Sequence, residues 1–344
     1  MNDNDVKTIS KIKSPKELFT MLEETVAVIL DTSSLRVLAL DEAELRYVLR
    51  KDIELGPAKG CENDAGALAL ELNDPLVVHL ADVQKAVFTK EVDDNIDVAL
   101  TVKRRDFLIS LRDKLVRFEA EFCVPGFSKD KLVIIFLVGR KLSKQAYSPV
   151  EIEALCTLAK QSARIIYSFN VLKKEVELFI GSIRKINDEL EAKDMYTRGH
   201  SLRVAQFSAI VGRKLSAELA KIPYSEICLY YAAEFHDVGK ISLPDEVLKK
   251  EHHLTELEWQ KMKTHPFESM KLIKQLEKWF GRIILEAVLY HHENFDGTGY
   301  PYGKKGEDIN ILARIIRVVD SFDAMITDRP YRKAMAHHEV IAEL

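Results

Sequence analysis

The sequence predicts an α+β domain, then a long linker helix, then an all-α bundle, and three observations support this order. Up to about residue 150, short β-branched runs alternate with stretches of helical apolar spacing. Between Pro149 and Pro223 the chain contains no proline, so a long helix can form there. Later segments repeat helical apolar patterns around one glycine-rich loop. We therefore place the domains at 1–150, 151–195 and 196–344.

Composition narrows the class of protein. With 344 residues, 47% of them hydrophobic and 30% charged, the chain can bury two cores of ordinary size. A formal net charge of −4 argues against a nucleic-acid polymer as partner. No apolar run approaches the roughly 20 residues of a spanning helix, and residues 1–5 are acidic, so we expect no membrane association and a cytoplasmic location. Reduced thiols are expected, because the cysteines are scattered at Cys61, Cys123, Cys156 and Cys228.

The first domain shows both strand and helix patterns. Residues 25–30 and 132–138 are β-branched runs that end at turn or charged residues, which predicts two strands. A helix is predicted over 102–118, because apolar side chains there have helical spacing. These side chains are Phe107, Leu108, Leu111, Leu115 and Val116.

The stretch after Ser148 predicts the linker helix. Ser148 is a candidate N-cap, and Pro149 suits the first helical position. Eight apolar residues follow at alternating steps of four and three: Ile165, Phe169, Leu172, Val176, Phe179, Ile183, Ile186 and Leu190. This 3.5-residue period is typical of a left-handed coiled coil, which predicts a parallel homodimer through the linker. The alternative is an amphipathic helix packed on its own domain.

The third domain is predicted to be helical almost throughout. One helix begins at His200, and a second over 227–235 is expected to end with Gly239 as its C-terminal cap. Thr255 and Glu258 have the capping-box spacing that begins a third helix. Further helices are expected at 283–290 and 311–326. The helix at His200 is expected to turn Val204, Phe207, Ile210 and Val211 inward.

Candidate metal ligands recur in this third domain. Nine of the ten histidines lie at or after position 200, and the candidate ligands are His200, His236, Asp237, His265, His291, His292 and Asp320. Nitrogen and oxygen donors without cysteine suit iron, manganese or zinc. Asp320 interrupts an apolar run, where an unpaired carboxylate would be costly and a bound cation would offset that cost. Each residue alone could instead be a surface or core side chain, so the cluster carries the prediction.

Two parts of the chain resemble known families. Residues 236–240, 291–301 and 328–334 resemble the motifs of the HD-GYP family of bacterial metal-dependent phosphodiesterases, and the likeness extends from about residue 196 to the end. Residues 123–151 are similar to the second half of a GAF sensory domain. A PAS-like sensor and a plain dimerisation domain are the alternatives for 1–150.

The HD-GYP resemblance implies a site with two divalent transition-metal ions, and iron and manganese are the expected metals. One ion would take His200, His236, Asp237 and Asp320, and the other would take Asp237, His265, His291 and His292. Such a pair acidifies water for phosphodiester hydrolysis. Asp237 and Lys240 would be catalytic, and Lys240, Arg314 and Tyr300 would contact substrate. The Gly-Tyr-Pro loop at Gly299–Pro301 is linked to partner contacts in the family, and we expect Asp296 to be structural.

The expected function is hydrolysis of cyclic di-GMP to the linear dinucleotide and onward to GMP. Alternatives are a hydrolase of another cyclic nucleotide, such as cyclic GMP-AMP, and a metal-bound module that signals through protein contacts without turnover. Tyr196 stands where some family members carry a third-metal glutamate, so we expect two ions, not three. The sequence stops at Leu344, so we expect the family's last helices to be missing or cut short.

Overall fold

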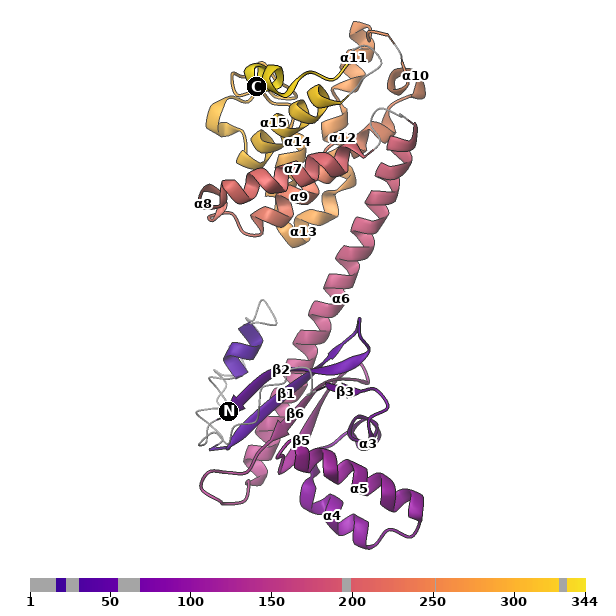
Figure 1. Ribbon diagram of the computed structural model, residues 1–344, viewed down its shortest axis with the longest axis vertical. Helices are drawn as coiled ribbons and strands as arrows, with labels where there is room; N and C mark the ends of the chain where they lie inside the picture. Colours follow the sequence, from indigo (N-terminus) through magenta and orange to yellow (C-terminus); the bar gives the residue numbers. More distant parts are fainter. Residues whose placement is uncertain (1–16, 23–30, 55–68, 194–198, 251, 328–332) are drawn as a thin grey trace. The chain divides into compact units, whose positions relative to one another are not determined.

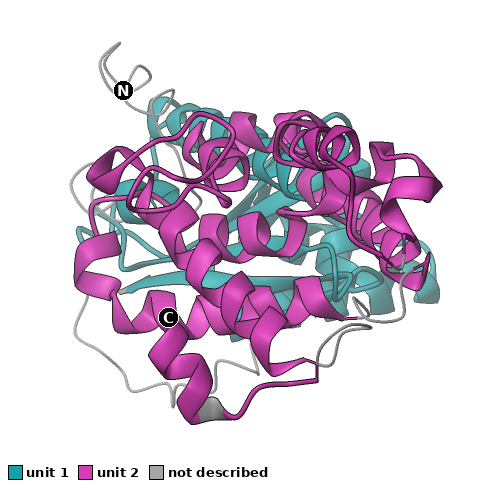
Figure 2. Ribbon diagram, turned by 90° about the horizontal axis from the view of Figure 1, so that it is seen from above, with its two compact units in different colours: residues 1–173 teal, residues 174–344 magenta. Residues whose placement is uncertain are grey.

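The computed structural model of the protein describes residues 17–22, 31–54, 69–193, 199–250, 252–327 and 333–344. The chain divides into two compact units, residues 1–173 and 174–344, which Figure 2 colours separately. None of the helices in the described ranges combines the length and the apolar character that crossing a bilayer requires. The strand expected at 25–30, Cys61, Tyr196 and most of the 328–334 motif lie outside the described residues.

The N-terminal unit is built on one antiparallel sheet of six strands in the order β3-β2-β1-β6-β5-β4 (Figure 1). The strands are β1 Ser34–Asp41, β2 Arg46–Glu54, β3 Ala69–Glu71, β4 Val87–Phe88, β5 Phe122–Ser128 and β6 Lys131–Val138. Strand β6 confirms the prediction at 132–138. It lies in the centre of the sheet, where Ile135 pairs with Leu38 of β1.

Both faces of the sheet are covered, which explains why its central strands are apolar on both sides. Along β1, Val37 packs in the core that includes Leu155 and Leu158 of α6, whereas Leu38 packs with Leu111 on the other face. The helices of this unit are α3 Pro75–Val83, α4 Thr89–Asp97 and α5 Val102–Arg117, and residues 17–22 are also helical. Helix α5 confirms its prediction, and Val116 on this helix is 58% exposed.

Helix α6, Pro149–Lys193, forms the predicted long helix. Ser148 and Glu151 cap its start: Oγ of Ser148 accepts from the Glu151 N–H at 3.4 Å, and Oε2 of Glu151 accepts from the Ser148 N–H at 2.7 Å. The predicted N-cap is therefore present. Because α6 contributes side chains to the cores of both units, it belongs to each of them along part of its length.

The apolar period of α6 is largely used inside this chain. Ile183 and Leu190 are buried, and the ring of Phe179 lies 6.0 Å from that of Trp279 in the C-terminal unit. From Val176 onward the seam thus follows the alternative expectation, in which the helix packs on its own domain. Leu172 is 37% exposed. The parallel homodimer stays a prediction, because the burial of the later seam residues does not require a second copy.

The C-terminal unit is a bundle of short helices around α7, α9, α14 and α15 (Figure 1). Its elements are α7 His200–Lys214, α8 Ser216–Leu219, α9 Ser225–Phe235, η1 Val238–Ser242, α10 Asp245–Leu248, α11 Glu256–Met262, α12 His265–Leu272, η2 Lys274–Leu276, α13 Glu277–Phe280, α14 Ile283–Leu289, η3 Gly306–Asp308, α15 Ile311–Ile326 and α16 His337–Glu343. Val204, Leu229, Val288 and Ile316 meet in its core. The prediction for Ile210 is wrong, since it is 48% exposed.

Two local predictions in this unit have different outcomes. The capping box is present, because Oγ1 of Thr255 accepts from the Glu258 N–H and Glu258 accepts from the Thr255 N–H. Gly239 is not a C-terminal cap: it lies inside the short helix η1 without a left-handed φ. A Cβ there would collide with the His265 carbonyl and the Ser269 amide. Gly239 therefore allows η1 and α12 to approach closely, which brings His265 to Asp237.

Candidate metal centre

The seven predicted ligand residues sit at helix ends or on one long helix. His200 and His265 are the first residues of α7 and α12, and His236 caps the end of α9. His291 and His292 follow α14, and Asp320 lies within α15. Side chains at helix ends can converge on one point from several directions, and the bundle packs these ends together.

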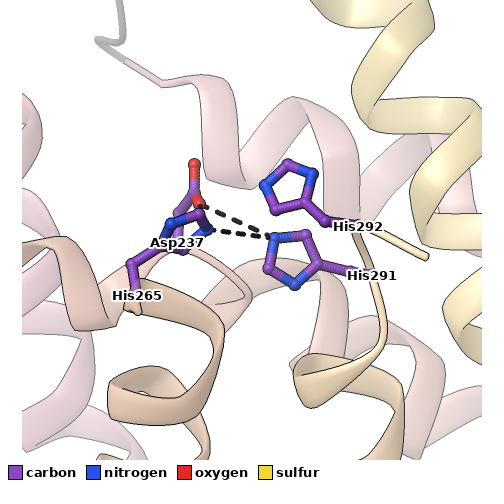
Figure 3. Close-up of side chains that lie close together, drawn as sticks. All are labelled: Asp237, His265, His291 and His292. Carbon is purple, nitrogen blue, oxygen red and sulfur yellow. Dashed lines mark hydrogen bonds and ion pairs between the residues drawn. The ribbon is translucent and has the colours of Figure 1, made fainter. Parts of the chain in front are cut away.

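The first cluster consists of His200, His236 and Asp320, each of which places a ligand atom within 4.8 Å of the others. Nε2 of His200 lies 3.2 Å from Oδ1 of Asp320, and Nε2 of His236 lies 3.9 Å from the same oxygen. The second cluster consists of Asp237, His265, His291 and His292. Figure 3 shows these four side chains directed toward one another.

Asp237 joins the two clusters. Its Oδ2 lies 3.4 Å from Nε2 of His236, on the side of the first cluster. Its Oδ1 lies 3.0 Å from Nε2 of His265 and 3.8 Å from Nε2 of His291, on the side of the second. One carboxylate thus faces both groups, each through a different oxygen, as a bridging ligand would.

The histidine tautomers follow from backbone contacts. Nδ1 of His236, His265 and His291 lies 2.6 to 2.7 Å from the carbonyl oxygen three residues earlier, which leaves Nδ1 as the protonated donor. Nε2 of each ring then carries a lone pair toward the centre. Such an outer contact is the usual way in which a protein orients a metal-binding histidine.

Converging acceptors make these clusters unfavourable without a cation. Nε2 of His265 and Oδ1 of Asp237 are both acceptors, so their 3.0 Å separation is no hydrogen bond. Among the described residues, Nε2 of His236 and Oδ1 of Asp237 are buried without a hydrogen-bond partner. Buried unpaired acceptors are costly, and a divalent ion would satisfy them. The donor set therefore fits a metal centre.

The charges of Asp237, His291 and His292 in the second cluster suit metal binding. Burial alone would raise the pKa of Asp237, but the Lys240 charge holds it well below its usual value. The Nζ of Lys240 contacts Oδ2 of Asp237 at 2.5 Å. Burial lowers the pKa of His291, and it lowers that of His292 to about 3. At neutral pH Asp237 is thus a carboxylate and the imidazoles of His291 and His292 are neutral, which are the ligand forms that metals take.

Asp323 is a site residue that the sequence analysis missed. Its Oδ2 lies 2.7 Å from Nδ1 of His200, and Arg203 donates to both of its oxygens at 2.7 and 2.9 Å. Burial alone would lower the pKa of His200, but Asp320 and Asp323 raise it to about 9. The available signal was a second acid one turn after Asp320 on the same helix.

The predicted substrate residues Tyr300 and Arg314 make different contacts. The ring of Tyr300 stacks on that of His292 at 4.7 Å and 26°, and burial raises the pKa of its phenol. Arg314 instead pairs with Glu307 at 2.7 Å and lies over the ring of Phe295. Arg317, which the sequence analysis also missed, lies one turn before Asp320, and its charge acts on Tyr300.

The loop around Gly299 is held by its own side chains. Oδ1 of Asp296 accepts from the N–H and the hydroxyl of Thr298, so the structural role predicted for Asp296 is present. Glu293, 1% exposed, accepts from the N–H groups of Tyr302 and Lys304. A Cβ on Gly299 would collide with the His292 carbonyl. The loop thus packs against the backbone of a candidate ligand.

Several known proteins are similar in sequence to this chain. Residues 183–344 match the HD domain family. A cyclic di-GMP phosphodiesterase of Thermotoga maritima is 27% identical over 88% of this chain and 83% of its own length. The 3'3'-cGAMP-specific phosphodiesterase 3 of Vibrio cholerae is 35% identical over 48% of this chain and 34% of its own length. The cyclic di-GMP phosphodiesterase response regulator RpfG of Xanthomonas campestris is 32% identical over 62% of this chain and 57% of its own length. The chain thus spans less than two thirds of two of these three relatives.

Solved structures that resemble this protein cover about half of its chain. A GAF domain from an Acinetobacter phosphoenolpyruvate-protein phosphotransferase has a TM-score of 0.36 and 19% identity, covering 50% of this chain and 97% of that chain. A GAF domain/HD domain protein from Geobacter sulfurreducens has a TM-score of 0.35 and 14% identity, covering 47% and 98%. The α+β unit, long helix and helical unit confirm the predicted fold class. Residues 183–344 match the HD domain family, and the chain is similar to proteins named cyclic di-GMP and 3'3'-cGAMP phosphodiesterases.

Proposed function

We propose that the protein is a metal-dependent phosphodiesterase that hydrolyses cyclic di-GMP to the linear dinucleotide and then to GMP. The observation that carries this proposal is the convergence of two His/Asp clusters on Asp237, whose two oxygens face one cluster each. The relatives are named as phosphodiesterases of cyclic dinucleotides, and these names support the proposed substrate class.

Two divalent ions, iron or manganese, are proposed as cofactors. His200, His236, Asp237 and Asp320 would hold one ion, and Asp237, His265, His291 and His292 would hold the other. When bound, such a pair supplies the positive charge that acidifies water and offsets the charge of a phosphodiester in displacement. The described residues fit this role because their lone pairs already point at two neighbouring centres.

The chain's own groups would orient the substrate. Lys240 lies against Asp237 with its side chain 25% exposed, so its ammonium group can reach a phosphate oxygen at the centre. Tyr300 keeps its proton at neutral pH, and the face of its ring stacks on His292. Arg317 offers a guanidinium on the side of α15 near Asp320. Arg314 would contact substrate only after leaving Glu307.

The test is an assay of the purified protein, loaded anaerobically with Mn²⁺ or Fe²⁺, against cyclic di-GMP. We expect the linear dinucleotide to appear first and GMP later. Lys240→Ala should keep the metal content and lose most of the turnover, whereas the exposed Lys271→Ala on α12 serves as the matched control. If neither cyclic di-GMP nor 3'3'-cGAMP is cleaved by metal-loaded protein, the enzyme proposal is wrong and the non-catalytic signalling module takes its place.

A hydrolase of 3'3'-cGAMP is the second candidate. It is favoured by the 35% identity to a relative named for that substrate. Both substrates present phosphodiesters to the same centre, so the ratio of the kcat/KM values measured side by side separates them. If kcat/KM is higher for 3'3'-cGAMP, this dinucleotide would replace cyclic di-GMP as the proposed substrate.

The remaining roles concern regulation. The N-terminal unit is proposed as a sensory or dimerisation domain that shares α6 with the HD domain. A homodimer would use the earlier part of α6, where Leu172 is exposed. The Gly-Tyr-Pro loop is proposed as a contact for a signalling protein, and Phe295 and Tyr302 beside it are 57% and 64% exposed.

A further inference from the structure

Glu191, near the end of α6, contacts the backbone on either side of His200. Its Oε2 accepts a hydrogen bond from the N–H of Gly199 at 2.5 Å, and its Oε1 accepts one from the N–H of Ser201 at 2.9 Å. Both carboxylate oxygens are thus used at the start of α7. The contact ties α6 to the chain segment that presents a candidate metal ligand.

Helix α7 needs this contact because its own cap lacks a side chain. Gly199 occupies the N-cap position with φ 70° and ψ 8°, and no side-chain cap comes from it. The first N–H groups of a helix have no partners within the helix. A carboxylate at that end satisfies two of them and also interacts favourably with the helix dipole.

A second polar contact joins α6 to the helix that delivers His236. Arg184 donates to both oxygens of Glu234 at 2.5 and 2.9 Å, and Glu234 precedes His236 by two residues. Nδ2 of Asn187 approaches the Glu234 carbonyl at 3.5 Å. Ile183 and Leu190, which are buried, hold the same stretch of α6 in the core.

The polar contacts of α6 border an open pocket at this corner of the unit. A cavity of about 510 Å³ lies beside the contacts, and Arg184, Asn187 and Glu191 contribute to its lining. The buried side chains of Ile183 and Leu190 and these polar contacts together place α6 against α7 and α9. Glu191 is therefore suited to set the position of the first turn of α7.

We propose that Glu191 is a positioning residue that holds His200 for the first ion, so that the last turns of α6 set how tightly this ion binds. The inference rests on the proposed metal centre. Both α6 contacts lead to the cluster of His200, His236 and Asp320. The histidines of the second cluster come from α12 and from the segment after α14.

The test compares Glu191→Ala and Glu191→Gln with Glu189→Ala, which removes an exposed carboxylate from the same helix. Mn²⁺ is titrated into the metal-free protein of 344 residues by calorimetry. We expect Glu191→Ala to bind one ion as the wild type does and the other at least tenfold more weakly. Glu191→Gln keeps one acceptor oxygen and should fall between, and Glu189→Ala should match the wild type.

Amide hydrogen exchange of the metal-free proteins gives a readout that does not depend on the ion. Exchange at 199–203 should be faster in Glu191→Ala and unchanged in Glu189→Ala. Equal weakening of both ions with a lower melting temperature would assign Glu191 a merely structural role and overturn the inference. Two ions bound by Glu191→Ala with wild-type affinities would also overturn it while leaving the metal centre standing.

A different result would reach the proposed function itself. If the wild type binds fewer than two ions, the metal centre fails, and the role of Glu191 fails with it. If Glu191→Ala does not fold, Glu191→Gln decides, because it has nearly the same volume and removes only one of the two acceptors. Wild-type binding of both ions by folded Glu191→Gln, with unchanged exchange at 199–203, would then overturn the inference.

Discussion

Nδ1 of His200 lies 2.7 Å from Oδ2 of Asp323, a carboxylate that is 1% exposed. Arg203 donates to both oxygens of the same carboxylate, which fixes its plane. Asp323 therefore holds the His200 ring with Nε2 toward Asp320. A buried carboxylate behind a histidine is a common support for a metal ligand.

Asp323→Asn should weaken the first ion. The amide cannot accept from His200 and from Arg203 as the carboxylate does, so the ring loses its fixed orientation. We expect metal affinity at this cluster to fall by about 10- to 100-fold. Titration with Mn²⁺ measures it, and Asp308→Asn, an exposed acid in the same unit, is the control. Unchanged affinity in Asp323→Asn would contradict the support role.

Asp237→Ala should lose more of its bound metal ions than His292→Ala. Asp237 faces both clusters through separate oxygens, whereas His292 belongs to the second alone. We expect elemental analysis to find about two ions per wild-type chain, about one in His292→Ala and close to none in Asp237→Ala. The double change His236→Ala with Asp237→Ala should also lose both ions and hydrolysis while circular dichroism stays helical. A third ion in the wild type would contradict the expectation drawn from Tyr196.

Gly239→Ala should destabilise the C-terminal unit and push η1 and α12 apart. The added Cβ would collide with the His265 carbonyl and the Ser269 amide, which are backbone atoms that cannot turn aside. We expect a loss of about 1–3 kcal/mol in the free energy of unfolding. Gly181→Ala is the control, since a Cβ there meets nothing within 4 Å. It lies inside α6 and should stabilise the protein by about 0.5–1 kcal/mol. Similar effects of both changes in chemical denaturation would contradict this account.

The contribution of the Glu151 cap of α6 to protein stability should depend on pH. The Lys141 ammonium, with the Ser148 N–H and hydroxyl, lowers the pKa of Glu151 from 4.5 to about 2. A carboxylate with a lowered pKa stabilises the fold above its unfolded value of 4.5, and this contribution is lost as the pH falls toward 2. Glu151→Gln should therefore melt below the wild type at pH 6 and together with it near pH 2. Exposed Glu153→Gln should show no such convergence.

A homodimer through α6 should depend on Leu172 more than on the later seam residues. Phe179 packs beside Trp279 of its own unit, so a charge at Phe179 would damage the HD domain directly. Leu172→Glu places a charge where the side chain is 37% exposed. We expect this variant to become monomeric in light scattering, with its metal content kept. If the wild-type protein is monomeric at tens of micromolar, the prediction of a homodimer is wrong.

The sequence by itself determined much of the secondary structure and the candidate ligand set. Helix α15 begins and ends at the predicted residues, and α5 and the cap at Ser148 also follow their local patterns. These features depend on neighbours within a few positions along the chain. The seven candidate ligands could be named from residue type and motif alone, since metal binding requires particular donor atoms.

Only the tertiary structure decided which groups these residues face. A 3.5-residue apolar period shows that a helix has a side to bury, but burial is not directional, so the period could not show that Phe179 and Ile183 pack on this chain's own helices. Asp323 supports His200 across 123 residues of sequence, and Glu191 caps a helix from outside it. Hydrogen bonds require defined distances and angles, which exist only after the helices have packed.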